Sequence, residues 1–565
     1  MRVTEVLSGE WAIRRRGHKA WVPGRVPGNL CMNLFYQGAL DDARIPGNSP
    51  RTYWVNDIEW EWVKRFDVEL EDDNLWMVVF KGIDGRAKIR FNDAPIRGRW
   101  GMADVTHLIK SRNELVVSFP RKRERRQLNR DGIIDHVFLI GSEDVMIVLM
   151  FTYAYESNGL WHVHIDLEIY SVREIATDCV ITIQRMKDVR AEDIKLELKK
   201  GLNTLSRDVP IPSLEYWEPW DVGEQVMYSV KATVVEDGVE LDTATDFVGF
   251  RRVEWSGNRI LINGKEEFVR GVEWAPLDLF LGEVEEQKYL KMLSHALNSN
   301  INTLVVPFRE KEDFYMICDN LGIMVWQSGG QVATRRLLVH PSVVVLPSKP
   351  KESTGTHIVS DRMFMRNIEF IRNERSVPGF VVTHKRFGEM VSSGRSDPRE
   401  LVVSTQLLQA RGLQREVEEN RLRKGRIAGI VLQRFNDAEP CVSESLVDFF
   451  GGTKLAYHKL KQAYNMFVAY LKMKRMKDGS MQGSVWVVND LGVEFKGTTL
   501  QVLLAKKGEE IEVFNTVMDV PKNSVTHAGD MRIPRLAKGA IVKTRLVSKG
   551  IILGENNYDL GSITK

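Results

Sequence analysis

Short apolar segments separated by turn residues dominate the first 250 positions of the chain. Segments 66–70, 76–81 and 114–119 alternate apolar with polar residues or run apolar throughout. Such segments, bounded by Gly and Asn-Asp turn signals, predict β-strands. Trp60 and Trp62 are two positions apart, so they share one face of a strand, as is typical of a sandwich core.

A second β-rich stretch follows, from about residue 145 to residue 250. Strands are expected at 161–170 and 226–236. The longest apolar run, 145–155, is too short to span a bilayer and predicts a buried strand. The pattern therefore favours two β-sandwiches in series.

The pattern changes after Arg251. Segment 283–300 has apolar residues at a helical period, and it precedes a strand at 303–306, a helix at 312–321 and a strand at 323–326. Alternation of strand and helix predicts a parallel α/β core. The elements expected further on are a strand over 429–435, a long amphipathic helix over 454–472, and the strands of a terminal sandwich over 484–565.

Composition and charge agree with a soluble multidomain protein. A chain of 565 residues is too long for one core and suggests three to five domains. Hydrophobic residues make up 43% and charged residues 27%, and the net charge of +3 gives no argument for nucleic-acid binding. Basic runs at 14–16, 121–126, 421–426 and 472–477 are interpreted as solvated loops and helix ends.

The cysteines and the N-terminus exclude several kinds of site. Cys31, Cys179, Cys318 and Cys441 lie far apart, without CxxC spacing or a nearby histidine. They are expected to be small buried side chains, so no metal, disulfide framework or other cofactor is predicted. Residues 1–21 lack an apolar signal-peptide core, which predicts a cytoplasmic protein.

Several motifs occur in a characteristic order along the chain. Residues 82–92 carry Gly-x-Asp-x-x-Ala-x-x-x-x-Asn, and residues 270–278 read Arg-Gly-Val-Glu-Trp-Ala-Pro-Leu-Asp. Residues 314–327 read FYMICDNLGIMVWQ, residues 340–345 begin with His-Pro-Ser, and 429–461 carry a strand followed by a helix. This series resembles the family 2 glycoside hydrolases of the β-mannosidase type over nearly the whole chain.

The resemblance implies a multidomain β plus α/β fold. Its parts would be a jelly-roll sandwich, an immunoglobulin-like β-sandwich, a (β/α)8-type barrel and a C-terminal β-sandwich, at 1–142, 143–250, 251–478 and 479–565. About a dozen residues separate Gln327 from His340, and about forty separate His340 from Phe380. We therefore expect a shortened barrel.

The catalytic positions implied by the resemblance depart from the family. Retaining hydrolysis requires two carboxyl groups about 5 Å apart. The expected acid/base glutamate is replaced by Lys351, with Glu352 one residue beyond it, and the expected nucleophile is replaced by Thr383. Glu352 and Glu389 are the remaining candidates for displaced carboxylates, but the simplest alignment predicts no catalytic pair.

The sugar-binding positions implied by the resemblance are only partly present. The residues that remain of the expected pocket mouth are Trp274, Asp278, Trp326 and Gln327. The cationic side chains expected in the same pocket are Lys349, Lys351, His384, Lys385 and Arg434. A cationic pocket favours an acidic ligand, such as a uronate or a phosphorylated sugar. The alternative is that these side chains point to solvent.

Three functions remain open from the sequence. The first is a pseudoenzyme that keeps the architecture for binding a carbohydrate or glycoconjugate, or as a scaffolding protein. The second is an active exo-β-glycosidase of the β-mannosidase type that uses displaced carboxylates, with Asp278 orienting the substrate. A third, binding to nucleic acid or a membrane surface through the basic runs, has no support in the fold pattern.

Overall fold

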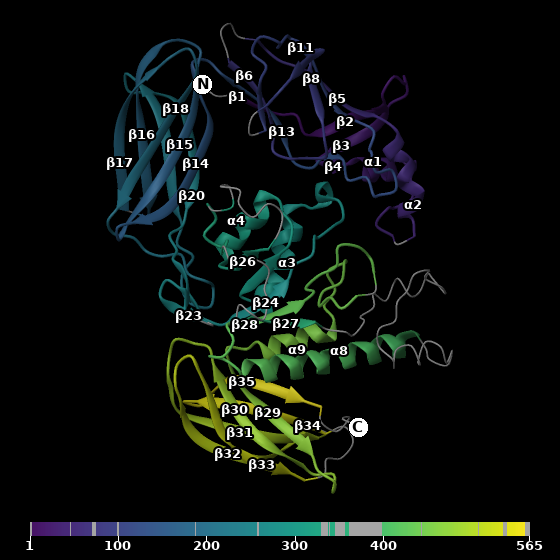
Figure 1. The fold of residues 1–565 in the computed structure, drawn as a ribbon, viewed down its shortest axis with the longest axis vertical. Coiled ribbons are helices and arrows are strands. Elements are labelled where there is room, and N and C mark those ends of the chain that lie inside the picture. Colours follow the sequence, from purple (N-terminus) through teal and green to yellow (C-terminus); the bar gives the residue numbers. More distant parts are fainter. Residues whose placement is uncertain are drawn as a thin grey trace.

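The computed structural model comprises four regions in chain order (Figure 1). We refer to them as the first sandwich (3–142), the second sandwich (145–248), the α/β region (253–463) and the C-terminal sandwich (467–558). The residues that the structure describes are 3–45, 47–70, 75–98, 101–186, 188–256, 259–328, 337, 339–344, 356–360, 398–441, 443–506, 508–534 and 540–559.

The first sandwich is built from a four-stranded sheet, β1-β13-β6-β10, and a six-stranded sheet, β3-β2-β5-β11-β8-β9, with a small sheet β4-β12-β7. As expected, Trp60 and Trp62 both point into its core and are 4% and 0% exposed. The elements are β1 (Val3–Val6), β2 (Gly9–Arg15), β3 (Val22–Val26), β4 (Gly28–Asn29), α1 (Leu30–Tyr36), α2 (Ser49–Thr52), η1 (Tyr53–Asp57), β5 (Trp60–Asp67), β6 (Leu75–Phe80), β7 (Ile83–Asp84), β8 (Lys88–Phe91), β9 (Ala94–Ile96), β10 (Met102–Asp104), β11 (Arg112–Phe119), β12 (Gly132–Ile133) and β13 (Val137–Ser142).

The second sandwich pairs sheet β14-β15-β18 with sheet β17-β16-β19-β20. Strict alternation along β15 buries Val163, Ile165 and Leu167 between the two sheets. The strands of the second sandwich could therefore be predicted from the sequence, because one face of each sheet is buried and the other is exposed. The elements are β14 (Val145–Ser157), β15 (Leu160–Ser171), β16 (Ile175–Arg185), β17 (Asp188–Leu198), β18 (Gly201–Ile211), β19 (Tyr228–Glu236) and β20 (Val239–Val248).

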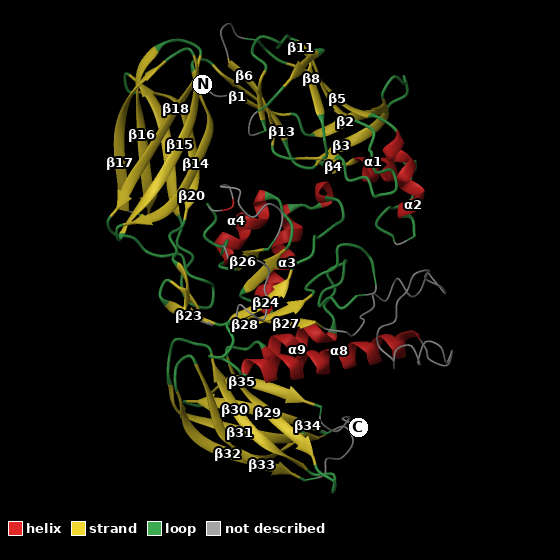
Figure 2. Ribbon diagram, viewed as in Figure 1, coloured by secondary structure: helices red, strands yellow, loops and turns green. Residues whose placement is uncertain are grey.

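The α/β region contains a parallel sheet in the order β26-β25-β24-β28-β27 (Figure 2). The predicted alternation of strand and helix is confirmed, and the expected helix over 312–321 coincides with α4. Within the described ranges these strands form an open sheet, with one further parallel bridge from Val325 to Val343. The elements are β21 (Val253–Ser256), β22 (Arg259–Ile262), β23 (Lys265–Glu267), β24 (Val269–Glu273), η2 (Leu281–Glu283), α3 (Glu286–Asn298), β25 (Thr303–Val306), α4 (Glu312–Leu321), β26 (Met324–Gln327), β27 (Thr356–Ser360), α8 (Pro398–Arg421), β28 (Gly429–Gln433) and α9 (Leu455–Ala463).

Both faces of the parallel sheet are buried. Val272 and Leu304 lie on the face covered by the helices, whereas Val305 and Trp326 belong to a second cluster that includes Trp217. Burial on both faces gives near-continuous apolar strands rather than alternation. The strands accordingly contain apolar runs such as 304–306 and 430–432, although β24 also carries the charged Arg270 and Glu273.

The expected long helix over 454–472 is wrong. Helix α9 ends at Ala463, and strand β29 begins at Phe467 and pairs with β30. The run Phe467 to Leu471 is buried on both faces, with Phe467 in one core cluster and Val468 in another. A short apolar run of this kind has no clear period, so the sequence alone does not distinguish it from a continuation of the helix.

The C-terminal sandwich pairs sheet β29-β30-β33 with sheet β32-β31-β34-β35. Its elements are β29 (Phe467–Arg475), β30 (Met481–Asn489), β31 (Phe495–Lys506), β32 (Glu509–Val520), β33 (Ser524–Ile533), β34 (Ile541–Ser548) and β35 (Ile551–Tyr558). Three of the four cysteines are buried, as expected, and Cys441 is half-buried; all four are free. Among the described helices, none has the length and apolarity that a membrane span requires.

Candidate functional site

A site is expected at the carboxyl ends of the parallel strands. In parallel α/β folds the loops that follow the strands carry the side chains that bind ligands or react. Strand β24 ends at Glu273, β26 at Gln327 and β28 at Gln433. Of the expected binding residues, Trp274 and Arg434 therefore follow directly after strands.

Trp274 is fully buried and holds a carboxyl group. Its ring stacks on Phe435 with centroids 6.0 Å apart, and its indole Nε1 donates to Glu310 Oε1 at 2.9 Å. The hydroxyl of Tyr289 donates to the other oxygen of Glu310 at 2.5 Å. Burial raises the pKa of Glu310, and the hydrogen bonds from Tyr289 and Trp274 oppose this shift. No sequence pattern marks Glu310, because a glutamate in a loop is expected to face solvent.

Gln327 and Trp326 lie on opposite faces of β26. The Gln327 amide donates to the carbonyl of Phe308 at 2.6 Å, and its oxygen accepts from the hydroxyl of Tyr315 at 3.0 Å. Trp326 instead packs in the cluster that contains Trp217. The structure therefore does not bring these two expected binding residues together, because consecutive strand residues point to opposite faces.

Asp278 is tied to the first sandwich. Its carboxylate lies 3.4 Å from Nη1 of Arg44 and 3.7 Å from Nζ of Lys288, and it also accepts from the backbone N–H of Phe280. Burial raises the pKa of Asp278, and the positive charges of Lys288 and Arg44 oppose this shift. Asp278 thus joins two regions of the molecule at the start of the loop after β24.

Arg434 is the expected cation that the structure describes. Its side chain is 39% exposed, and Nη1 lies 4.0 Å from Oδ1 of the buried Asp437. Asp437 also accepts from Ser445 Oγ at 2.7 Å and lies 3.7 Å from Nζ of Lys454. Asp437 can therefore share its charge between two cations, one exposed to solvent and one buried.

The charge of one arginine of the first sandwich acts on a carboxyl group that follows β28. Glu439, five residues after Arg434, has a pKa that burial raises. The negative charge of Asp437 also raises that pKa, whereas the positive charges of Arg434 and Arg130 lower it. Arg130 lies in the loop before β12 of the first sandwich, and its side chain is exposed. Two arginines from different regions therefore act on one carboxyl group.

The expected catalytic candidates lie outside the described residues. These are Glu352 and Glu389, together with the expected cations Lys349, Lys351, His384 and Lys385. Thr383, at the expected nucleophile position, also lies outside them, and Thr356–Ser360 forms the strand β27 beside β28. Over the part of the chain that the structure describes, no three His, Cys, Asp or Glu side chains are grouped to hold a metal ion.

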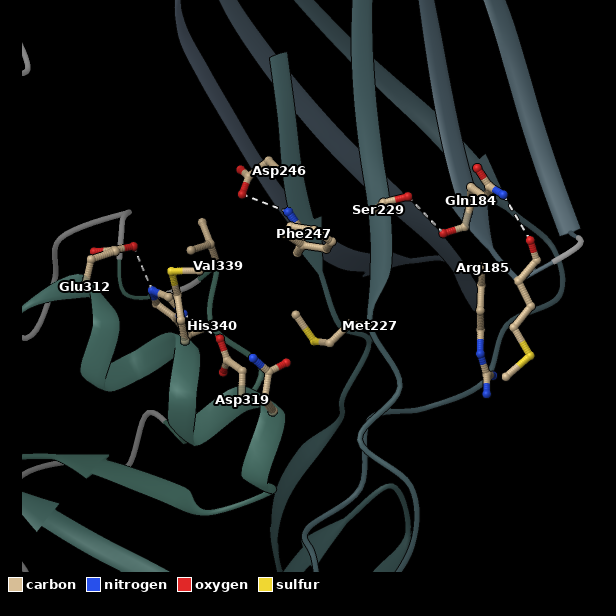
Figure 3. Close-up of a pocket in the computed structure, with 13 residues that line it drawn as sticks. Gln184, Arg185, Met227, Ser229, Asp246, Phe247, Glu312, Asp319, Val339 and His340 are labelled. Carbon is tan, nitrogen blue, oxygen red and sulfur yellow. Dashed lines mark hydrogen bonds and ion pairs between the residues drawn. The ribbon is translucent and has the colours of Figure 1, made fainter. Parts of the chain in front are cut away.

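A cavity of about 580 Å³ lies elsewhere, between the second sandwich and helix α4 (Figure 3). His340 in its lining contacts Asp319 Oδ2 through Nδ1 at 2.6 Å and Glu312 Oε1 through Nε2 at 3.0 Å. Burial alone would lower the pKa of His340, but the two carboxylates raise it to about 9. His340 is part of the His-Pro-Ser motif, and it serves here as a buried cation.

Comparisons with known proteins agree with the order of the regions. The family model for the glycosyl hydrolase 2 galactose-binding domain-like region matches residues 11–144, and that for glycosyl hydrolases family 2 matches residues 150–251. A β-mannosidase from Capra hircus is 26% identical over 399 residues, which cover 57% of this chain and 45% of the relative. β-Mannosidase B from Thermothelomyces thermophilus is 23% identical over 386 residues, which cover 58% and 45%.

Solved structures extend the similarity in fold to the whole chain. A β-D-mannosidase from Dictyoglomus thermophilum superposes with a TM-score of 0.79 at 19% identity, covering 98% of this chain and 89% of the other. An exo-chitosanase from Amycolatopsis orientalis gives 0.77 at 16% identity, covering 98% and 84%. The matches to the curated relatives span less than half of each relative's length. Together, the two family models, the relatives and the shared fold show that the chain is similar to the β-mannosidases of glycoside hydrolase family 2.

Proposed function

We propose that this protein binds carbohydrate without hydrolysing it. The proposal rests on one observation: the carboxyl groups Glu310 and Asp278, near the described strand ends, are both held by neighbouring side chains. Glu310 is held by Trp274 and Tyr289, and Asp278 is held by Arg44 and Lys288. Double displacement needs one carboxylate that can reach the anomeric carbon and a second group that can deliver a proton.

The sequence supports the same proposal at the two catalytic positions. Lys351 and Thr383 stand where the resembled family has its acid/base and its nucleophile. A lysine and a threonine cannot replace this pair, because proton transfer and charge stabilisation each contribute several orders of magnitude to the rate. Loss of both groups would leave a fold suited to binding alone.

The ligand class that we propose is a sugar with an acidic group. Arg434 is partly exposed, and Arg130 acts on the same carboxyl group, Glu439. Guanidinium groups bind carboxylates and phosphates in a bidentate geometry. A uronate or a phosphorylated sugar fits these two arginines better than a neutral sugar does.

Two measurements on the full chain test the proposal. Hydrolysis of an aryl β-mannoside is expected to be absent, and calorimetry is expected to detect glucuronate or mannose 6-phosphate at millimolar concentration, with mannose binding more weakly. Turnover that is abolished in Glu352→Gln or Glu389→Gln would establish instead an active exo-β-glycosidase of the β-mannosidase type. Absence of binding to all three sugars would refute the binding function.

A further inference from the structure

We propose that the cavity between the second sandwich and α4 binds a small organic cation, namely a protonated amine carried on an apolar body. This inference is independent of the proposed carbohydrate function. Figure 3 shows α4 on one side of the cavity and strands of the second sandwich on the other. Small-molecule sites commonly lie at such boundaries between domains, with volumes of roughly 300–1,000 Å³.

The cavity is separate from the carboxyl ends of the parallel strands. Glu312 and Asp319 in its lining belong to α4, and Asp246 belongs to β20. Trp274 and Arg434, which follow the strand ends, do not belong to its lining. A ligand in this cavity would therefore contact the second sandwich and α4 rather than the residues considered above for sugar binding.

One part of the lining is apolar and adaptable. Phe247, Met186 and Met316 are 50%, 81% and 47% exposed, and Met227 lies between the sandwich and α4. Thioether side chains are flexible and polarisable, so they fit ligands of varied shape and make favourable contacts with aromatic rings. Exposed apolar side chains grouped around a cavity are a common feature of binding surfaces.

The charged part of the lining is acidic. Three carboxyl groups line the cavity, on Asp246, Glu312 and Asp319, and His340 contacts two of them. The other cation, Arg185, pairs with Glu215 and, at 3.5 Å, with Glu224, neither of which belongs to the lining. An anionic ligand would therefore meet an unfavourable potential, whereas a cation would be attracted.

Asp246 is the group that an ammonium would contact. Its carboxylate accepts from Thr152 Oγ1 at 2.7 Å and from the backbone N–H of Phe247 at 2.8 Å, and both donors are neutral. Burial raises the pKa of Asp246, and His340 contributes a weaker opposing effect through its charge. A half-buried carboxylate held by neutral donors gains more from an added cation than one already in an ion pair.

Calorimetry of the full chain with three matched probes tests this inference. The probes are 2-phenylethylamine, the neutral 2-phenylethanol and the anionic 3-phenylpropanoate. We expect the amine to bind at least tenfold more tightly than the alcohol, and the anion not to bind. Equal affinity for amine and alcohol, or no detectable binding of the amine at millimolar concentration, would overturn the proposal.

Two variants locate the binding in the cavity. Asp246→Asn is expected to weaken amine binding about tenfold, whereas Asp208→Asn, on β18 of the same sandwich and outside the lining, is expected to leave it unchanged. If Asp246→Asn does not fold, Met316→Lys serves instead, because it places an ammonium beside the cavity from an exposed helix position. Unchanged amine affinity in a folded Asp246→Asn, or in Met316→Lys, would refute the site.

Discussion

The two ends of the parallel sheet use charged residues in different ways. At the amino end, Arg270 of β24 joins a buried network with Asp221, Asp490 and Arg421. At the carboxyl end, Arg434 is partly exposed and makes one long contact with Asp437, at 4.0 Å. Both ends hold paired charges, since Arg44 and Lys288 contact Asp278 at the carboxyl end, but the carboxyl end also keeps Arg434 partly exposed to solvent.

The buried network joins three regions of the molecule. Asp490 follows β30 of the C-terminal sandwich and contacts Arg270 Nη1 at 3.2 Å, Lys424 Nζ at 2.7 Å and the guanidinium of Arg421. Burial alone would raise the pKa of Asp490, but these three cations hold it well below its usual value. Several cations around one carboxylate compensate for the loss of hydration.

The difference in exposure between Arg270 and Arg434 agrees with the roles of the two sheet ends in α/β folds. Loops at the carboxyl ends of parallel strands carry function, while residues at the amino ends contribute to stability. Arg270 is 1% exposed and lies where the second sandwich, the sheet and the C-terminal sandwich meet. We therefore expect substitutions at the amino end to affect folding and substitutions at the carboxyl end to affect binding.

The largest expected effect is at Asp490. Asp490→Asn leaves Arg270, Arg421 and Lys424 without their shared carboxylate, and we expect it to destabilise the protein by about 3–5 kcal/mol, measured by chemical denaturation. The control is Asp41→Asn, whose partner Arg51 is 73% exposed, with an expected cost below about 1 kcal/mol. Equal effects in the two variants would contradict the comparison.

Glu418 of α8 provides a contrast to Asp490, because it is a buried carboxyl group whose hydrogen-bond donors are neutral side chains. It accepts from Asn556 at 2.7 Å and from Tyr558 at 3.0 Å, and burial raises its pKa to about 7 against these hydrogen bonds. The folded state thus keeps a proton that the unfolded state releases above about pH 4.3. Stability contributed by this group falls as pH rises from about 4.3 to about 7.

Glu418→Gln removes this pH dependence. We expect the variant to gain stability relative to the wild type by on the order of 3 kcal/mol between pH 4 and pH 8. Denaturation midpoints of both proteins across that interval give the measurement. A constant difference between the two proteins at every pH would show that Glu418 does not titrate in this range.

The smallest expected effect on stability is at Arg434. Arg434→Ala removes a partly exposed cation with one 4.0 Å contact, so we expect a change within about 0.5 kcal/mol. On the proposed function, the same variant loses most of its affinity for glucuronate, whereas Arg51→Ala keeps it. A loss of stability comparable to that of Asp490→Asn would erase the distinction between the two ends.

Much of the fold could be predicted, and less of the candidate site. Helix 312–321 was predictable because its apolar residues recur at a helical period. It is followed by Gly322, whose φ of 73° is a conformation that glycine adopts readily. The end of helix α9 at Ala463 was not predictable, because the apolar run that follows it is buried on both faces and shows no strand alternation. Glu310 was missed because nothing in its local sequence marks a buried carboxyl group.

Local patterning alone determined most of the series of strands and helices and the resemblance to family 2 glycoside hydrolases, because periodicity and motif order are properties of neighbouring residues. Tertiary structure decided which side chains meet. Trp326 and Gln327 are adjacent in sequence yet separate across the sheet, whereas Arg270 and Asp490 are 220 positions apart and touch. Charge pairing and burial depend on how distant segments pack, so only the folded chain could reveal them.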